Sequence, residues 1–170
     1  NNISNSYVSG SINVIGNYWM PVGGLCGVSF GSSNIENCYN LSIINCTNNK
    51  EEYGEANITL GGIVGQTEGG EVNINRCFNK GNLTVDGGNN VIIVGGICGR
   101  VNNTSTINVI NSYNNSKITV ETLKGDSYIA GITAQMQSTS NIINCYNSGE
   151  IVEKGTTTES KDYKIGGIIA

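Results

Sequence analysis

Six cysteines are the residues of this 170-residue chain with the most obvious potential for chemistry. Zinc and redox sites commonly use Cys-x-x-Cys pairs or histidines, and the sequence contains neither. Thiols without such partners are usually buried and pack as small apolar groups. We therefore expect free buried thiols and no metal site. Cys46 is the best candidate for a disulfide with a neighbouring cysteine.

Catalysis has few candidate residues. Without histidine, a Ser-His or Cys-His nucleophile pair cannot form within the chain. The 13 acidic residues are scattered, although Asp86, Asp126 and Asp162 occupy comparable positions in successive copies of a repeat. We interpret these three as solvated turn residues, with a weak calcium site as the alternative. The prediction is a protein that is not an enzyme, with no catalytic, cofactor-binding or metal-ligating residues and no cofactor.

The elements that must position these side chains belong to a five-fold internal repeat. One block resembles Asn-Cys-Tyr-Asn and is centred on Ser6, Cys38, Cys77, Ser112 and Cys145. The other resembles Gly-Gly-Ile-x-Gly, and its second glycine is Gly24, Gly62, Gly96, Gly131 or Gly167. The two series interleave with a period of about 35 residues, which is typical of solenoid or propeller proteins.

The composition favours strands between turns. Ile and Val dominate the apolar residues, while 24 glycines and 27 asparagines supply turn positions. Each copy offers three strand candidates, which in the third copy are Val72–Cys77, Asn82–Asp86 and Val91–Cys98. We predict an all-β fold, a right-handed parallel β-helix or β-solenoid of five coils of ~35 residues with three short strands per coil. Residues 1–170 form one domain, which we expect to be a segment of a longer repeat protein.

Stacked coils convert repeated positions into columns of side chains. We expect three apolar columns to form the core and the Cys/Ser column to line a tight inner corner. The core columns are Ile3, Ile35, Ile74, Val109 and Ile142; Ile12, Ile44, Leu83, Ile118 and Ile151; and Leu25, Ile63, Ile97, Ile132 and Ile168.

Two polar columns flank the Cys/Ser column and predict asparagine ladders at the corners, where Asn can adopt a left-handed turn. They are Asn5, Asn37, Arg76, Asn111 and Asn144, and Val8, Asn40, Asn79, Asn114 and Asn147.

An aromatic column follows, made of Tyr7, Tyr39, Phe78, Tyr113 and Tyr146. We interpret it as a packed ladder covering one corner, with an exposed strip that stacks on sugars as the alternative. The stretch Tyr18, Trp19, Met20 and Pro21 breaks the repeat and contains the only Trp and the only Pro. It is either a contact site or a cover for one end of the solenoid.

Charge and hydropathy exclude several function classes. The net charge is −4, with lysines and arginines spread singly, which argues against nucleic-acid binding and against a basic membrane patch. No stretch has the roughly 18 apolar residues of a spanning helix, so we expect no membrane insertion in this segment.

The glycine blocks resemble a known repeat. Gly24–Gly27, Gly62–Gly65 and Gly96–Gly99 are similar to the Gly-Leu-x-Gly core of the GLUG motif, whereas Gly131–Ala134 and Gly167–Ala170 lack its final glycine. The resemblance spans essentially the whole chain. It implies large secreted or surface-attached bacterial and protist proteins, often adhesin-like, with right-handed β-helical repeats and no catalytic residues.

We therefore expect a non-enzymatic extracellular module, secreted or at a cell surface, that acts as a rigid rod presenting loops or terminal domains. The first alternative is a fibre-forming protein whose open solenoid ends assemble head to tail. The second is a carbohydrate-binding β-helix. The expected partners are accordingly other protein chains, at the ends or surface, or glycans of a host or cell surface.

Overall fold

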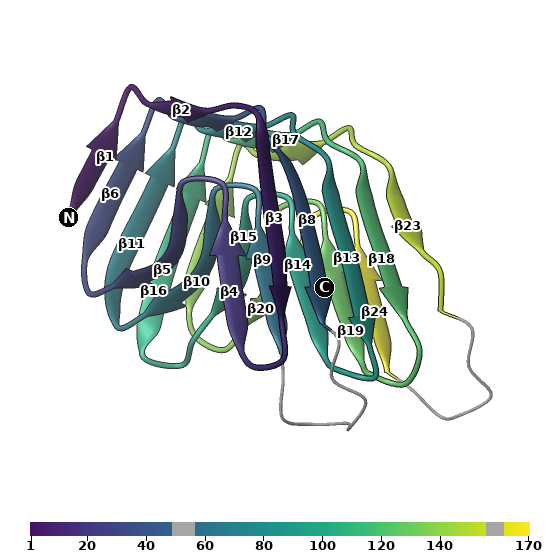
Figure 1. Ribbon diagram of the computed structural model, residues 1–170. Coiled ribbons are helices and arrows are strands. Elements are labelled where there is room, and N and C mark those ends of the chain that lie inside the picture. Colours follow the sequence, from purple (N-terminus) through teal and green to yellow (C-terminus); the bar gives the residue numbers. More distant parts are fainter. Residues whose placement is uncertain (49–56, 156–161) are drawn as a thin grey trace.

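The computed structural model describes residues 1–48, 57–155 and 162–170. Within these residues the chain forms 24 strands in five parallel sheets, which we number in chain order (Figure 1). Sheet 1 contains β1 (Asn2–Ser4), β6 (Ser33–Glu36), β11 (Gly70–Asn75), β16 (Ser105–Ile110) and β21 (Ser140–Ile143). Sheet 2 contains β2 (Tyr7–Val8), β7 (Tyr39–Asn40), β12 (Phe78–Asn79), β17 (Tyr113–Asn114) and β22 (Tyr146–Asn147).

Sheet 3 contains β3 (Ser11–Gly16), β8 (Ile43–Asn48), β13 (Leu83–Gly88), β18 (Ile118–Thr122) and β23 (Ile151–Glu153). Sheet 4 contains β4 (Met20–Gly23), β9 (Ile58–Gly61), β14 (Ile92–Gly95), β19 (Ser127–Ala130) and β24 (Tyr163–Gly166). Sheet 5 contains β5 (Cys26–Phe30), β10 (Val64–Glu68), β15 (Cys98–Val101) and β20 (Thr133–Met136).

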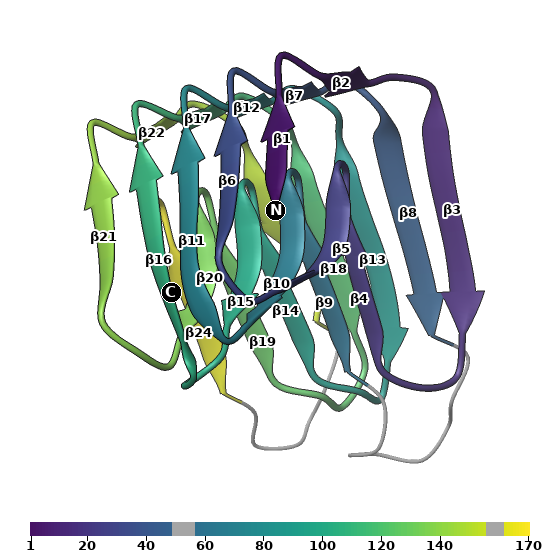
Figure 2. The same ribbon diagram turned by 90° about the vertical axis from the view of Figure 1, so that its left-hand side faces the viewer.

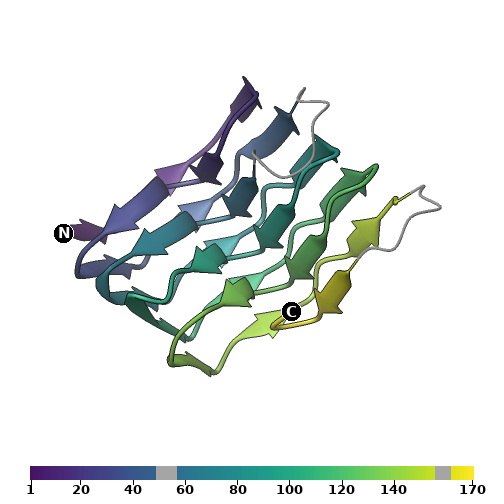
Figure 3. The same cartoon turned by 90° about the horizontal axis from the view of Figure 1, so that it is seen from below.

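The predicted all-β parallel solenoid is confirmed, but its coil is different. Five strands make one turn, not three, and the described residues complete four turns, not five. A fifth turn has strands β21–β24 and only an isolated bridge, Thr133 to Ile169, in sheet 5. Successive turns follow one another from the purple to the yellow end of the molecule (Figure 3). The described residues contain no helix that could cross a membrane.

The additional strands arise because the chain reverses at each glycine block. Sheets 4 and 5 lie between sheets 1 and 3, and the turns that join sheet 4 to sheet 5 approach sheet 2 from inside (Figures 1 and 2). The prediction of one strand over Val91–Cys98 therefore merged β14 with the start of β15. The two-residue strands of sheet 2 were too short to give a hydrophobic pattern.

This arrangement divides the interior into two main cores, with a small third cluster of Ile93, Ala130 and Ala134 between sheets 4 and 5. One apolar cluster lies between sheets 3 and 4 and includes Ile44, Ile58 and Leu83. The other lies between sheets 1 and 5 and includes Ile35, Val64 and Ile74. The three predicted core columns are confirmed, because their members stack from turn to turn and belong to these two main clusters. The last turns also retain the fold, since Ala130 and Ala134 are fully buried where earlier turns carry glycine.

The first asparagine column forms the predicted left-handed corner. All five residues have φ between 50° and 54°, including Arg76. Asparagine tolerates this conformation better than other non-glycine residues. Outward amides also link neighbouring turns, as in the bond from Asn37 Nδ2 to Asn5 Oδ1 (3.3 Å). Arg76 instead pairs with the carboxylate of Glu36.

The second asparagine column forms a ladder inside the solenoid. The Nδ2 of Asn40 donates to Asn79 Oδ1 (2.8 Å), Asn79 donates to Asn114 (3.0 Å), and Asn114 donates to Asn147 (2.8 Å). The first three side chains are fully buried. Their Oδ1 atoms also accept bonds from the chain two residues ahead, so each amide fixes its own corner and joins two turns.

The second glycine of each glycine block packs directly on this ladder. A Cβ at Gly62 would lie 2.4 Å from Asn79 Cγ and 2.2 Å from the carbonyl oxygen of Gly96. Equivalent contacts occur at Gly24, Gly96 and Gly131. The buried amide of Asn79 and the backbone at Gly96 cannot move away in the packed interior, so this position has no room for a side chain. The two repeated sequence blocks are therefore the two halves of one contact.

We predict that Gly62→Ala destabilises the protein by about 3 kcal/mol or more, because the added methyl overlaps backbone and amide atoms in a packed interior. Thermal and denaturant unfolding followed by circular dichroism would measure the change.

Gly167→Ala is the matched control. Gly167 occupies the same column, but nothing lies within 4 Å of the position that its new methyl group would occupy, and its φ is not positive. We expect its stability to change by no more than about 0.5 kcal/mol. Equal effects of the two substitutions would contradict the role given to the glycine–asparagine contact.

Candidate functional site

The cysteines take up structural positions. All six are free thiols; Cys38, Cys46, Cys77 and Cys98 are buried, and Cys26 and Cys145 are half-buried. In the Cys/Ser column each sulfur donates to a backbone carbonyl of the preceding turn, as from Cys77 Sγ to Ile35 O (3.5 Å). The prediction of free thiols is confirmed, and that of burial holds for four of the six.

Burial also makes these thiols poor nucleophiles. Loss of solvation raises the pKa of Cys46, Cys77 and Cys98 to about 12 in each case. The pKa values of Cys26 and Cys145 are raised for the same reason. Since the reactive form of cysteine is the thiolate, thiol chemistry is suppressed at neutral pH.

The three aspartates singled out by the repeat do not come together. Asp86 lies in β13 of sheet 3, where it pairs with Glu121 of the next turn. Asp126 lies outside that column, because its backbone carbonyl accepts a hydrogen bond from the backbone nitrogen of Ile92 in sheet 4. Only Asp126 and Asp162 are neighbours, through the bond from Asp162 N to Asp126 Oδ1 (3.2 Å). Asp126 and Asp162 therefore share one column before sheet 4, and Asp86 belongs to a different column in sheet 3. Among the described residues no group of three or more potential ligands is arranged to hold a metal ion.

The aromatic column is a continuous stack. Neighbouring ring centroids are 4.7–5.1 Å apart with interplanar angles of 3–9°. This confirms the predicted packed ladder. The stacked arrangement covers the faces of the three inner rings and leaves their edges at the surface. Sugars stack on ring faces, so within this column only the outer faces of Tyr7 and Tyr146 remain for such a contact.

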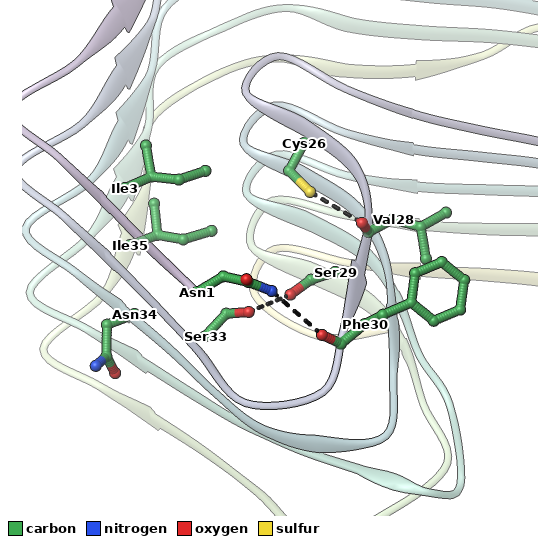
Figure 4. Close-up of a pocket in the computed structure, with 9 residues that line it drawn as sticks. All are labelled: Asn1, Ile3, Cys26, Val28, Ser29, Phe30, Ser33, Asn34 and Ile35. Carbon is green, nitrogen blue, oxygen red and sulfur yellow. Dashed lines mark hydrogen bonds between the residues drawn. The ribbon is translucent and has the colours of Figure 1, made fainter.

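An apolar cavity of about 290 Å³ opens at the N-terminal end, between β1, β5 and β6 (Figure 4). The side chains of Ile3, Ile35 and Cys26 form its walls, and Val28 lines it while its side chain points away from Ile3 and Ile35 (Figure 4). Its polar contacts are internal, such as the bond from Ser29 Oγ to Ser33 Oγ (2.9 Å). No ionisable carboxylate or amine side chain lines it, so the cavity suits an apolar group and not acid–base chemistry.

The cavity has a simple origin in the repeat. Ser33 pairs with Val72, and Val72 with Ile107, so these three occupy one column of sheet 1. The next two turns fill the core at this position with the branched side chains of Val72 and Ile107, whereas Ser33 and the adjacent Asn1 leave space. The cavity is thus an unfilled end of the core between sheets 1 and 5.

The stretch from Tyr18 to Pro21 divides between core and surface. Met20 and Pro21 begin β4, and Met20 packs into the core between sheets 3 and 4. Trp19 is 46% exposed, and its indole Nε1 donates to Gln66 Oε1 (3.3 Å) in the next turn. This bond directs Trp19 to the boundary between sheets 4 and 5. That the four residues form a contact site or an end cover stays a prediction.

The boundary between sheets 4 and 5 carries the most varied side chains, and we call it the seam. From sheet 5 it receives the in-register residues Val28, Gln66, Arg100 and Gln135. From sheet 4 it receives Pro21, Thr59, Ile93, Tyr128 and Lys164. The two rows meet, because Thr59 Oγ1 donates to Gln66 Oε1 (3.3 Å) within the buried part.

Sequence reasoning pointed to Trp19 and Pro21 but missed the rest of the seam. Its residues come from nine strands that are far apart in sequence, and among them only Gln66 and Gln135 share a residue type. A usable signal was present: between the constant glycines, these positions change from turn to turn. In a repeat protein the constant columns maintain the coil, and variable columns are free to carry function.

Comparisons with known proteins support the fold. No protein-family model matches the sequence, and no curated protein matches it. The chain is similar to the crystal structure of a candidate immunoglobulin A1 protease from Bacteroides ovatus, with a TM-score of 0.64 and 26% sequence identity. The match covers 98% of this chain and 49% of that one, so the chain spans about half the length of the structure it matches.

We predict that thiol-modifying reagents distinguish the two classes of cysteine. In the folded protein at pH 8, Cys26 and Cys145 should be modified first, and the four buried thiols should react only on unfolding. Peptide mass spectrometry after brief alkylation would identify the sites. Rapid modification of Cys77 or Cys98 in folded protein would contradict the described packing.

Proposed function

We propose that this chain is a non-enzymatic structural and adhesive repeat module of the GLUG type, secreted or held at a cell surface. Its right-handed coil acts as a stiff rod that presents loops or further domains. The observation that supports a rod is continuity: sheets 1 to 4 each pair through five strands, all in parallel. A bend would have to break several of these ladders in the same place.

Proteolysis is not part of the proposal, although the similar Bacteroides ovatus protein carries a protease name. The Ser-His and Cys-His pairs that many proteases use cannot form, because the sequence has no histidine. Burial raises the pKa of Cys46, Cys77 and Cys98 to about 12, which disfavours these thiols as nucleophiles. Incubation with immunoglobulin A1 should leave the heavy chain intact; a defined cleavage product would overturn the non-enzymatic assignment.

Rigidity along the axis is tested by a distance measurement. Ser9 and Ser148 are exposed, follow equivalent strands of sheet 2 and lie four turns apart. Spin labels coupled to non-canonical azide residues at these positions should give one narrow distance distribution, near 20 Å before adding the linkers. Pulsed electron paramagnetic resonance would measure it. A broad distribution would contradict the rod.

Head-to-tail fibres remain the alternative, and one observation counts against a junction in which the asparagine ladder continues from one copy into the next. Stacking a second copy in register would place its Val8 next to Asn147. The Asn147 amide donates to Gly149 O (3.1 Å) and would leave its other hydrogen facing an apolar side chain. Binding of glycans is a second candidate function, favoured by the variety of side chains in the seam.

A further inference from the structure

Arg100 lies in β15 at the middle of the seam. Its Nη2 donates to Gln137 Oε1 (3.2 Å), and the guanidinium forms no ion pair with the described residues. Its Nε is buried and has no hydrogen-bond partner among them. A partly buried guanidinium without an anion is costly, because the loss of hydration is not offset. Such a group is suited to an anionic ligand.

Gln135 adds an acceptor at the neighbouring position. It pairs with Arg100 in register, one turn further along sheet 5, and its Oε1 is also buried without a partner among the described residues. An unpaired donor and an unpaired acceptor therefore occur side by side in the same column. Both could be satisfied by a ligand that carries an anionic group together with hydroxyl groups, after a side-chain rotation exposes them.

Trp19 supplies an apolar surface toward the N-terminal end of the seam. Its ring is half-exposed, and its bond to Gln66 holds it beside sheet 5. Arg100 lies two turns beyond the turn that contains Trp19, so the two residues are separated by about 10 Å along the axis. That separation fits a short oligosaccharide, with one ring against the indole and an acidic group on the guanidinium.

The remaining charges of the seam are already engaged. Glu68 accepts from Gln66 Nε2 and from Asn102 Nδ2 (2.7 Å), one bond to each carboxylate oxygen. Lys164 lies 4.7 Å from the centroid of the Tyr128 ring and 3.6 Å from Asp162. Arg100 is thus the cation of the seam that lacks an anionic partner among the described residues.

We propose that the seam between sheets 4 and 5 binds a carboxylate-bearing oligosaccharide, with the carboxylate on Arg100 and a sugar ring against Trp19. This inference rests on the glycan-binding candidate function and not on the rod. Its failure would leave the spin-label distance unaffected, so the two proposals are separately testable.

The chain has a single tryptophan, so its fluorescence reports on the seam without any label. Titration with a galacturonic acid trimer should shift or quench the emission and saturate. The fully methyl-esterified trimer, which lacks the charges, should bind about ten-fold more weakly or not at all. This comparison uses the unmodified protein, so it does not depend on how any variant folds.

Substitutions at Arg100 then test whether its guanidinium contacts the carboxylate of the trimer. Arg100→Gln should weaken binding of the trimer by about ten-fold or more, and Arg100→Lys should recover only part of the affinity, because lysine lacks the planar fork. Lys80→Gln is the matched control, since Lys80 is an exposed cation beside Phe78 on sheet 2 and its loss changes the net charge equally. Its affinity should stay within about two-fold. Circular dichroism and melting would check the fold of each variant.

Three results would overturn the proposal. The first is no change in Trp19 emission up to millimolar trimer. The second is equal affinity for the acid and its methyl ester. The third is an equal loss of affinity in Arg100→Gln and Lys80→Gln, which would indicate attraction by overall charge in place of a site.

Discussion

The rest of the structure depends on the contact between the buried asparagine ladder and the glycine column that packs on it. Asn40, Asn79 and Asn114 lie at the inner surface of sheet 2, and each glycine turn is brought against the amide of the following turn. Because only glycine allows this approach, the chain can fold back inside its own coil. That reversal creates sheets 4 and 5, the two main cores and the seam.

The same contact separates structural positions from variable ones. Columns that hold the coil repeat a residue type in nearly every turn, and the exceptions are accommodated locally, as Arg76 is by its pairing with Glu36. The seam has no such constraint beyond its glycines. Polar, aromatic and charged side chains therefore follow one another there, and an arginine without an anionic partner among the described residues is left at its centre.

The sequence predicted the solenoid, its period and its core columns, because isoleucines and valines recur at fixed intervals and stack in register. It also predicted the left-handed corner at Asn5 and Asn37, which depends on a local preference of asparagine. It failed on five strands per turn, because the reversal at Gly62 depends on contact with Asn79 of the next turn. The seam was equally hidden: Gln66 and Arg100 become neighbours only through the stacking of β10 on β15.

Exchange of side-chain amide protons in Asn79 and Asn114, compared with those of Asn73 and Asn108, tests the central claim most directly. The first pair is fully buried in the internal ladder, and the second pair forms an outer ladder at the surface of sheet 1. Nuclear magnetic resonance should show the internal amides exchanging only with global unfolding, and the outer amides exchanging rapidly. Similar rates for the two pairs would contradict an internal ladder that holds the turns together.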